Sequence, residues 1–454
     1  MPSPSLPESL LTPEHEIHII GLGVSHRAVL SGAARSAIDQ ADWVLGSERQ
    51  LATLGSLVKA DALVKADALV IPYQYKTLPK ISALYEYLKV SSHQKIVVLA
   101  SGDPLLYGIG RWFLSHVERE FLVFHPAVSS VQAACHWVGI AWQDTEVLSL
   151  HGRSLERMRA VLRNNRYYIV LTDKKSQPQT IAQECIALGF ASSKLWVCER
   201  MGYVDQRLSL FSATELASSN LHFNALNVVV LHTAGEGGVL PEFPGIENTH
   251  FVTDGPRGQG LLSKREVRLT ILSLLQPRAG DVGWDVGAGC GGVTVEWARW
   301  NPLGRVFAIE QDSVRFKCLE ENIHNFGLDA NTQLICDRAP AALNELPAPT
   351  AVFIGGSQGA LGALLDTCWE RLAVGGRLVA CAVTENSKAQ LHQFADKLES
   401  SGGNVAIEAL QISVSRGETL AGNRLYRPQL PVTLIKYTKL NTGFESDDKN
   451  GDER

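Results

Sequence analysis

Residues 281–298, with the sequence DVGWDVGAGCGGVTVEWA, constrain the fold more than any other stretch of the chain. They begin with the apolar run Val282–Val286, which has the length and bulk of a buried parallel strand. A glycine-dense turn follows at 287–292, and the next residues predict the start of a helix. Glycine lets the backbone of such a turn approach a bound molecule, because a Cβ atom would collide with it. The stretch therefore predicts a strand–turn–helix unit of an α/β domain, with a ligand at the turn.

Two acidic residues narrow the class of that ligand. Asp285 stands two residues before the first glycine of the turn, where nicotinamide-binding loops usually carry an apolar residue. Glu310 follows a second predicted strand at 305–309, where its carboxylate can accept hydrogen bonds from ribose hydroxyls. The two acids would repel a pyrophosphate, which S-adenosylmethionine lacks. They favour a methyltransferase over a dinucleotide-binding protein, and both over a tight turn that binds nothing.

Composition points to a cytoplasmic multidomain protein. The 454 residues correspond to about three domain-sized units. The net charge of -5 gives no reason to expect nucleic acid or an anionic membrane as a partner. The eight cysteines include no C-x-x-C pair, which favours reduced thiols over a disulfide framework or a metal site. The N-terminus lacks the features of a signal peptide, and no apolar run approaches the roughly 18 residues of a membrane helix.

The first half of the chain predicts an α/β domain over residues 16–235. Residues 1–15 are rich in Pro and Ser and predict a flexible tail. A strand at 17–20 and a buried strand at 95–100 belong to a first lobe, about 16–125. Four further strands, at 147–150, 167–171, 195–198 and 227–231, predict a second lobe, about 126–235. Between residues 57 and 70 the sequence LVKADA is duplicated, which we interpret as a lengthened surface helix or loop.

The second half predicts a separate α/β domain over residues 251–440. Residues 236–250 are rich in Gly and Pro without periodicity and predict a linker. Strands at 351–354 and 377–383 continue the alternation of strand and helix, and Trp284 and Trp297 are expected in the core. The polar residues 441–454 predict a disordered tail.

Two glycine turns of the first half carry a resemblance to a known family. Gly21-Leu22-Gly23 follows the first strand, and Gly102-Asp103-Pro104 follows the strand at 95–100. With Ser129 and Ser130 at the start of a helix, they resemble the tetrapyrrole (precorrin and uroporphyrin) methylase family. The resemblance implies a two-lobed fold with the methyl donor held between the lobes by Gly21, Gly23, Gly102, Asp103, Pro104, Ser129 and Ser130. Many members have G-x-G-P-G-D at the first turn, where this chain has GLGVSH.

The second half resembles the decarboxylating methyltransferases of the same pathway. The matching segments are 263–268, 285–291, 338–343, 353–357 and 415–417. The resemblance implies a Rossmann-like class I methyltransferase domain whose donor site is lined by Ser263, Asp285, Gly287, Ala288, Gly289, Cys290, Gly291, Glu310, Asp337 and Ala339. Many members carry an acid before that alanine, where this chain has Arg338, so an adenine contact there must come from the backbone or from Asp337.

The order of the two halves resembles the fused methyltransferases of cobalamin biosynthesis. The resemblance implies that the first half methylates C5 of a precorrin-6 macrocycle. The second half would methylate C15 and remove the carboxylate of the C12 acetate, giving precorrin-8. S-adenosylmethionine would be the donor in both halves, and we expect a homo-oligomer. The sulfonium already makes the methyl group electrophilic, so alignment matters most and no catalytic residue is predicted.

Several cations suit a substrate with many carboxylate arms, because guanidinium groups bind carboxylates in bidentate fashion. The candidate substrate-binding residues are Arg153, Arg257, Lys264, Arg265 and Arg268. Lys264 and Arg268 are four residues apart and should share one helix face. A solvated surface charge is the competing interpretation for each of them.

Two other hypotheses remain open at this stage. The chain could fuse a tetrapyrrole methylase with an RNA or protein methyltransferase, which would predict a basic groove or a motif such as Asn/Asp-Pro-Pro-Tyr. Ile354-Gly355-Gly356-Ser357 stands at that place instead. The altered first turn also allows a scaffold with one decayed donor site. Calorimetry separates the hypotheses, since the enzyme should bind two donors per chain and the scaffold one or none.

Overall fold

The structure, a computed structural model, describes residues 16–54, 74–89, 95–235, 241–256, 260–402 and 404–441. The chain divides into two compact units. The first comprises Met1–Leu155 and Leu162–Gly238, and the second comprises Glu156–Val161 and Val239–Arg454. Both predicted tails (apart from Asn441), the LVKADA duplication and the first five residues of the predicted linker lie outside the described residues.

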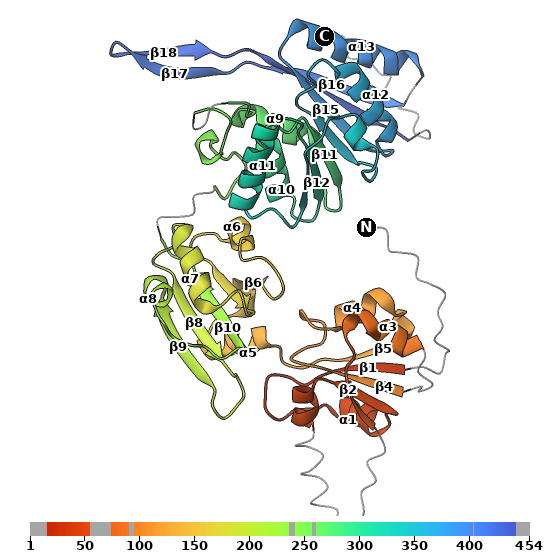
Figure 1. Cartoon of the computed structure of the whole chain (residues 1–454), viewed down its shortest axis with the longest axis vertical. Helices are drawn as coiled ribbons and strands as arrows, with labels where there is room; N and C mark the ends of the chain where they lie inside the picture. The colour runs from red at the N-terminus through yellow and green to blue at the C-terminus, as the bar shows by residue number, and fades with distance from the viewer. Residues whose placement is uncertain are drawn as a thin grey trace, which may run out of the picture. The chain divides into compact units, whose positions relative to one another are not determined.

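The first lobe of the first unit is a parallel sheet with the strand order β3-β2-β4-β1-β5 (Figure 1). Its strands are β1 (Glu16–Gly21), β2 (Trp43–Gly46), β3 (Gln74–Thr77), β4 (Lys95–Ala100) and β5 (Leu122–His125). Its helices are α1 (Gly32–Asp39), α3 (Ile81–Lys89) and α4 (Gly110–His116). Buried side chains on the two faces of this sheet form separate apolar clusters, so the central strands β4 and β1 are apolar on both faces.

The second lobe is a mixed sheet with the order β6-β7-β10-β8-β9. Its strands are β6 (Thr145–Ser149), β7 (Tyr167–Leu171), β8 (Lys194–Glu199), β9 (Arg207–Ser212) and β10 (Asn227–His232). Its helices are α5 (Ser130–Val138), α7 (Pro178–Ala187) and α8 (Ala213–Ala217), while the short α6 (Arg157–Val161) is grouped with the second unit. The four strands predicted here are confirmed, and β9 was missed because it is a largely exposed edge strand without an apolar run.

The second unit contains a seven-stranded sheet in the order β13-β12-β11-β14-β15-β19-β16. Its strands are β11 (Val282–Val286), β12 (Arg305–Ile309), β13 (Thr332–Ile335), β14 (Ala351–Ile354), β15 (Arg377–Ala382), β16 (Val405–Ile412) and β19 (Val432–Lys439). The first five strands in that order run parallel, and β19 is antiparallel to both of its neighbours. A hairpin of β17 (Ser415–Leu420) and β18 (Asn423–Pro428) projects from this sheet (Figure 1).

Helices cover both faces of this sheet. Side chains of α9 (Arg265–Leu275), α10 (Gly292–Trp300) and α11 (Ser313–Asn325) form one apolar core, which includes Trp297. Side chains of α12 (Leu361–Arg371) and α13 (Glu385–Ser400) form the other core, with Trp284. The strand order reverses at β11, which has β12 on one side and β14 on the other. Ligands of open α/β sheets bind outside the carboxyl ends of the strands at such a point.

The second part of the predicted linker packs into the second unit. Ile246 is fully buried in the core beneath α9 and α10. The backbone N–H groups of Ile246 and Gly245 donate to the Glu296 carboxylate at 2.7 and 3.3 Å. The segment has no periodicity because its backbone is irregular, with a short 3₁₀ turn at Asn248–His250, and not because it is free of the domain.

Candidate functional site

A cavity of about 550 Å³ lies at the carboxyl ends of β11, β12 and β14. The predicted residues that line it are Ser263, Lys264, Asp285, Gly287, Ala288, Gly289, Glu310, Asp337 and Ala339. The structure thus gathers most of the donor-site residues expected in the second half. Cys290 and Gly291 do not line the cavity, since the thiol of Cys290 is buried and lies 3.6 Å from Asp254 Oδ1. Burial raises the pKa of that thiol to about 12.

The glycine turn leaves no room for side chains. Gly287 has φ +74°, and a Cβ atom there would collide with the backbone of Gly356 after β14. Gly289 has φ +59°, and its Cβ would lie 2.7 Å from the carbonyl oxygen of Leu261. Both the left-handed backbone and the lack of space therefore require glycine. The turn is a close approach of three backbone segments around the cavity.

Asp285 places a buried carboxylate in the cavity wall. Its side chain is fully buried at the end of β11, and its Oδ2 accepts a 2.5 Å hydrogen bond from Thr294 Oγ1. No described group donates a hydrogen bond to Oδ1. Burial raises the pKa of this carboxyl to about 7, against the opposing effect of the Thr294 hydrogen bond. A buried acceptor of this kind fits a ligand that brings a hydrogen-bond donor or a positive charge.

Glu310 directly follows β12, as expected from its place after the predicted strand at 305–309. Its Oε2 accepts a hydrogen bond from the backbone N–H of Gly289 at 2.8 Å. Its Oε1 accepts one from the backbone N–H of Asp312 at 2.8 Å, next to the N-terminus of α11. The carboxylate therefore fixes the glycine turn as well as facing the cavity.

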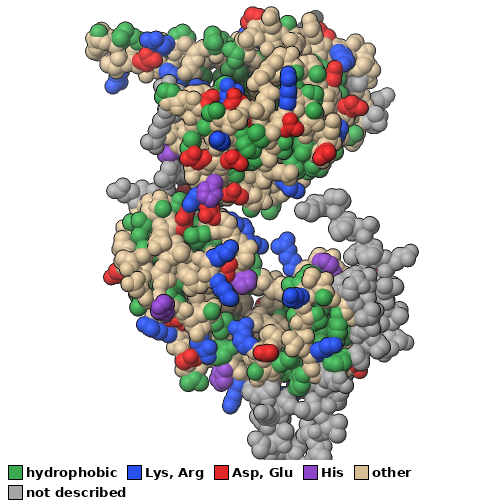
Figure 2. Space-filling model, viewed as in Figure 1, with side chains coloured by type: hydrophobic (Ala, Val, Ile, Leu, Met, Phe, Trp, Pro, Cys, Tyr) green, Lys and Arg blue, Asp and Glu red, His purple; other side chains and the backbone are tan. Residues whose placement is uncertain are grey.

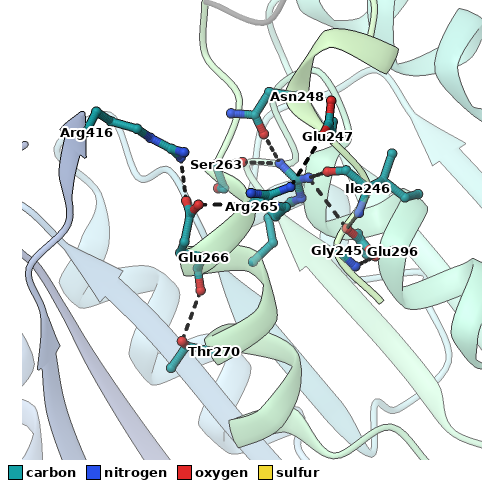
Figure 3. Close-up of polar contacts among 11 residues, drawn as sticks. Gly245, Ile246, Glu247, Asn248, Ser263, Arg265, Glu266, Thr270, Glu296 and Arg416 are labelled. Atoms are coloured by element: carbon teal, nitrogen blue, oxygen red, sulfur yellow. Dashed lines mark hydrogen bonds and ion pairs between the residues drawn. The ribbon is translucent and has the colours of Figure 1, made fainter. Parts of the chain in front are cut away.

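The structure separates the predicted cations. Lys264 lines the cavity, and none of the described acids forms an ion pair with it. Arg265 lies outside the cavity lining, within 3.7 Å of both Glu247 and Glu266, and Glu266 is in turn bound by Arg416 of β17 at 2.6 Å (Figure 3). Arg257 lies outside the described residues, and Arg153 is exposed in a turn of the first unit.

The expectation that Arg268 binds substrate is corrected. Its side chain is 0% exposed, and its guanidinium is occupied by Glu296, Asn248 and two backbone carbonyls. The spacing of four residues from Lys264 places it one turn into α9, on the face that packs against α10. The sequence gives no sign of this, because the matching acid Glu296 is 28 residues away.

In the first unit the three predicted segments meet at the carboxyl ends of β4, β1 and β5. The backbones of Gly23 and Gly102 bond to each other, with Gly102 N–H donating to the Gly23 carbonyl at 3.1 Å. Gly21 is closely packed, since a Cβ there would lie 2.6 Å from the carbonyl oxygen of Gly102. A Cβ at Gly102 would lie 3.5 Å from Ser129 Cα and 3.6 Å from the nitrogen of Ser130.

Asp103 and Ser129 hold these loops together. Asp103 Oδ1 accepts from the backbone N–H groups of Leu105 and Leu106, which shapes the turn after Pro104. Its Oδ2 accepts from the N–H of Ala127 at 3.3 Å. Ser129 caps α5 through a capping box with Gln132, as its place before the helix predicted. The side chains of Asp103 and Ser129 thus organise the loops, and their oxygens are already engaged in hydrogen bonds within the protein.

Surface charge, possible metal ligands and helix hydrophobicity give little support for another kind of functional site. Figure 2 shows acidic and basic side chains interspersed on the visible face of the second unit, and several Lys and Arg side chains around a hollow in the first. Across the described ranges, no group of three or more His, Cys, Asp and Glu residues is placed to hold a metal ion. No helix within those ranges is long and apolar enough to span a membrane.

Sequence reasoning missed several residues of the cavity in the second unit. Cys381 lines the cavity from β15, in a stretch that reads as core, and burial raises the pKa of its thiol to about 12. Thr294 does not line the cavity, but its hydroxyl binds the Asp285 carboxylate from behind the cavity wall. Arg315 lines the cavity from α11 and pairs with Asp254 at 3.0 Å. Phe353, Gly355, Gly356 and Ser357 also line the cavity, and the resemblance of segment 353–357 to the family implied no role for any of them.

Comparison with known proteins finds a matching family model for each half of the chain. Residues 16–217 match the family model of tetrapyrrole (corrin/porphyrin) methylases. Residues 252–439 match the model of the precorrin methyltransferase domain. A precorrin-6Y C(5,15)-methyltransferase (decarboxylating) of Sinorhizobium sp is 31% identical over 93% of this chain and 96% of its own length. The chain belongs to the precorrin-6Y C(5,15)-methyltransferase (decarboxylating) family. It is therefore a methyltransferase, with the predicted two-lobed α/β domain followed by a Rossmann-like one.

Two further proteins with this name are similar to the chain. The protein of that name from Mycobacterium tuberculosis (strain CDC 1551 / Oshkosh) is 33% identical over 93% of this chain and 100% of its own length. The crystal structure of the C-terminal domain of the enzyme from Rhodobacter capsulatus is 35% identical, covers 44% of this chain and 100% of that chain, and has a TM-score of 0.39.

Proposed function

We propose that the chain is a bifunctional enzyme of cobalamin biosynthesis that acts on a precorrin-6 type macrocycle. The first unit methylates C5, and the second methylates C15 and removes the carboxylate of the C12 acetate, giving precorrin-8. S-adenosylmethionine is the methyl donor in each unit. The observation that carries this proposal is the pair of glycine turns, each at the carboxyl edge of a different sheet in a different unit.

The residues of the second unit fit the donor. The turn around Gly287 and Gly289 is a cradle that any Cβ atom would fill. Asp285 Oδ1 is a buried acceptor without a partner in the described residues, and it would accept a hydrogen bond from the ammonium group of the donor. Glu310 would accept hydrogen bonds from ribose hydroxyls, and the cavity residues Asp337 and Ala339 would face the adenine.

The residues of the first unit fit the donor less directly. Gly21, Gly23, Gly102, Asp103, Pro104, Ser129 and Ser130 form the walls at the ends of β1, β4 and β5. Since Asp103 and Ser129 already hold the loops, we propose that the donor there is bound mainly by backbone groups. A Cβ at Gly102 would lie in contact with the backbone of Ser129 and Ser130, so three backbone segments come together here, as this arrangement requires.

The acceptor side of the second site carries free positive charge. Lys264 and Arg338 both line the cavity, and no described acid pairs with either side chain. We propose that they bind carboxylate arms of the macrocycle, whose flat face would pack on the exposed apolar residues Leu261 and Val383 at the same cavity. Arg153 would bind carboxylate arms in the first unit, and Arg257 and Arg265 would bind them in the second.

The chemistry needs alignment more than acid–base catalysis. The donor supplies an electrophilic methyl group, and the chain's residues orient the carbon that receives it. Such orientation can lower the barrier by about 7–11 kcal/mol. For the decarboxylation, the conjugated macrocycle takes up the electron pair, and the protein holds the acetate carboxylate where water is largely excluded.

Titration calorimetry with S-adenosylmethionine tests the proposal. We predict two binding sites per chain, one of which is lost in Gly289→Val. One site or none in a folded protein would contradict it and would favour a scaffold with a decayed site. Homo-oligomerisation, which we also propose, is measured separately by sedimentation.

A further inference from the structure

One wall of the cavity in the second unit has no regular structure of its own. Residues 260–264, which we call the strap, all line the cavity and lie in neither a helix nor a strand. Leu262 is buried in the core with Cys290, whereas Leu261 is 57% exposed. A segment without a backbone ladder must be held by other groups if it is to shape a binding site.

Asp254 holds the first part of the strap. Its Oδ1 accepts from the backbone N–H of Leu261 at 2.8 Å, and its Oδ2 accepts from Arg315 Nε at 3.0 Å. These hydrogen bonds hold the pKa of the Asp254 carboxyl below its usual value. The carbonyl of Leu261 accepts from the N–H of Cys290 at 3.3 Å, so the strap lies directly on the glycine turn.

Arg268 holds the other part. Its Nη1 donates to the carbonyl oxygen of Ser263 at 2.5 Å and to Asn248 Oδ1 at 2.7 Å. Its Nη2 donates to the carbonyl oxygen of Ile246 and lies 3.5 Å from Glu296 Oε1. Figure 3 shows these four partners converging from residues 246–248, from the strap and from α10. One buried guanidinium therefore joins the strap to residues 246–248 and to α10.

The charge of Arg268 is not explained by stability alone. A buried ion pair often contributes no more than apolar side chains of the same volume, because both charges lose their hydration. Glu296 has other donors, namely the N–H groups of Ile246 and Gly245 and Trp300 Nε1 at 2.8 Å. What an apolar residue or a lysine cannot supply is the planar fork that reaches Ser263, Asn248 and Ile246 together.

We propose that Arg268 is a positioning residue for the second methylation, acting through the Ser263 carbonyl. It fixes the strap against the glycine turn and so sets the shape of the donor cavity, without touching donor or substrate. The inference rests on the proposed function for the identity of the ligand, but the anchoring of the strap does not depend on it.

The variant Arg268→Lys tests this in the full-length chain, with Arg377→Lys as the matched control. Arg377 is also buried, pairs with Asp281 at 2.5 Å and does not line the cavity, because it lies at the amino end of β15. Both variants lose part of a buried ion pair, and only one loses contacts to the strap. Hydrogen exchange of the amides at 260–264 and the KM for S-adenosylmethionine in C15 methylation are the two readouts.

We expect Arg268→Lys to expose the strap amides to faster exchange and to raise the KM roughly tenfold, with a smaller change in kcat. Arg377→Lys should change neither. Equal exchange and equal KM in the two variants would overturn the proposal.

Asp254→Ala provides a second route if Arg268→Lys does not fold, because removing the Asp254 carboxylate frees the N–H of Leu261 in the strap and leaves the buried pair of Arg268 and Glu296 in place. It should also speed strap exchange and raise the KM, and unchanged values would overturn the proposal. If the wild-type second unit binds no donor, the proposed function fails, while strap exchange still tests the anchoring.

Discussion

At the scale of single residues, Asp285 combines full burial with a strongly raised pKa. Its pKa of about 7 in the folded chain lies above the ordinary value of 3.8. Between these values the unfolded chain has lost the proton and the folded chain has kept it. Asp285 therefore reduces the free energy of unfolding as pH rises from about 4 to about 7, and the cost is constant above that range.

Asp285→Asn should remove that dependence. Between pH 5 and pH 8 the free energy of unfolding should fall less in the variant than in the wild type, because the variant has no buried carboxyl to ionise. The difference should be on the order of a few kcal/mol. Urea unfolding at the two pH values measures this. Parallel pH dependence of variant and wild type would show that the carboxyl is ionised at pH 5.

The same carboxyl should make donor binding depend on pH. A cationic ammonium group favours the ionised form, so the affinity of the second unit for S-adenosylmethionine should rise as pH increases to about 7 and then level off. Calorimetry from pH 5.5 to 8.5 should show this in the wild type, and a flat profile in Asp285→Asn. A wild-type affinity that falls over this range would contradict the role of Asp285.

Glu310→Ala should weaken donor binding in the second unit by about 1–3 kcal/mol, because ribose hydroxyls and the Gly289 N–H both lose their acceptor. Glu310→Gln is the matched variant, since its amide oxygen can retain one of these bonds, and it should lose less. C5 methylation should be unchanged in both. An equal loss of both methylations would show that Glu310 does not belong to one site.

The location of Asp285 and Glu310 at the cavity was predictable, because local sequence fixes their places relative to a strand end and a glycine turn. Arg268 was not, because helical spacing shows which residues share a face but not which face is buried. Its partner Glu296 belongs to a different helix, which only the tertiary fold brings near. Thr294 carried no signal, since a threonine near a helix start is ordinary.

At the scale of elements, apolar runs identified the central strands of all three main sheets. Several missed strands lack such runs: β9 is an exposed edge, β13 is half-buried, and β17 and β18 form a hairpin of mostly exposed residues. The buried strand β19 was missed although Leu434 and Ile435 give it an apolar core. The expected alternation of strand and helix also ends at α13, after which β16 to β19 follow one another. Antiparallel strands need no helix between them, so the pattern of the parallel part could not predict this region.

A single substitution in each glycine turn should abolish one of the two methylations and leave the other. Gly289→Val would force a Cβ against the Leu261 carbonyl and should abolish C15 methylation and carbon dioxide release, leaving C5 methylation. In Gly102→Val the Cβ would lie in ordinary contact with the backbone of Ser129 and Ser130, but φ is +63° and the rest of the side chain would fill the site at the strand ends. It should abolish C5 methylation only.

Circular dichroism must show that both glycine variants are folded before product analysis by mass spectrometry. Carbon dioxide release that survives in folded Gly289→Val and disappears in folded Gly102→Val would reverse the assignment of the two reactions.

At the scale of the whole molecule, the order of two unlike α/β units was predictable, whereas the boundary between them was less so. A fragment 241–454 keeps Ile246 in the core and both N–H groups that bind Glu296. We expect it to fold and to bind S-adenosylmethionine. A fragment 251–454 loses the buried Ile246 and should be less stable by about 2–5 kcal/mol in urea unfolding. Equal stability of the two fragments would show that residues 241–250 are a linker after all.

The most direct test of the central claim is a single incubation of the full-length chain with a reduced precorrin-6 and methyl-labelled S-adenosylmethionine, followed by mass spectrometry of the tetrapyrrole. We predict a product with two labelled methyl groups that has lost one carbon dioxide. A product with a single methyl group, or two methyl groups without loss of carbon dioxide, would contradict it.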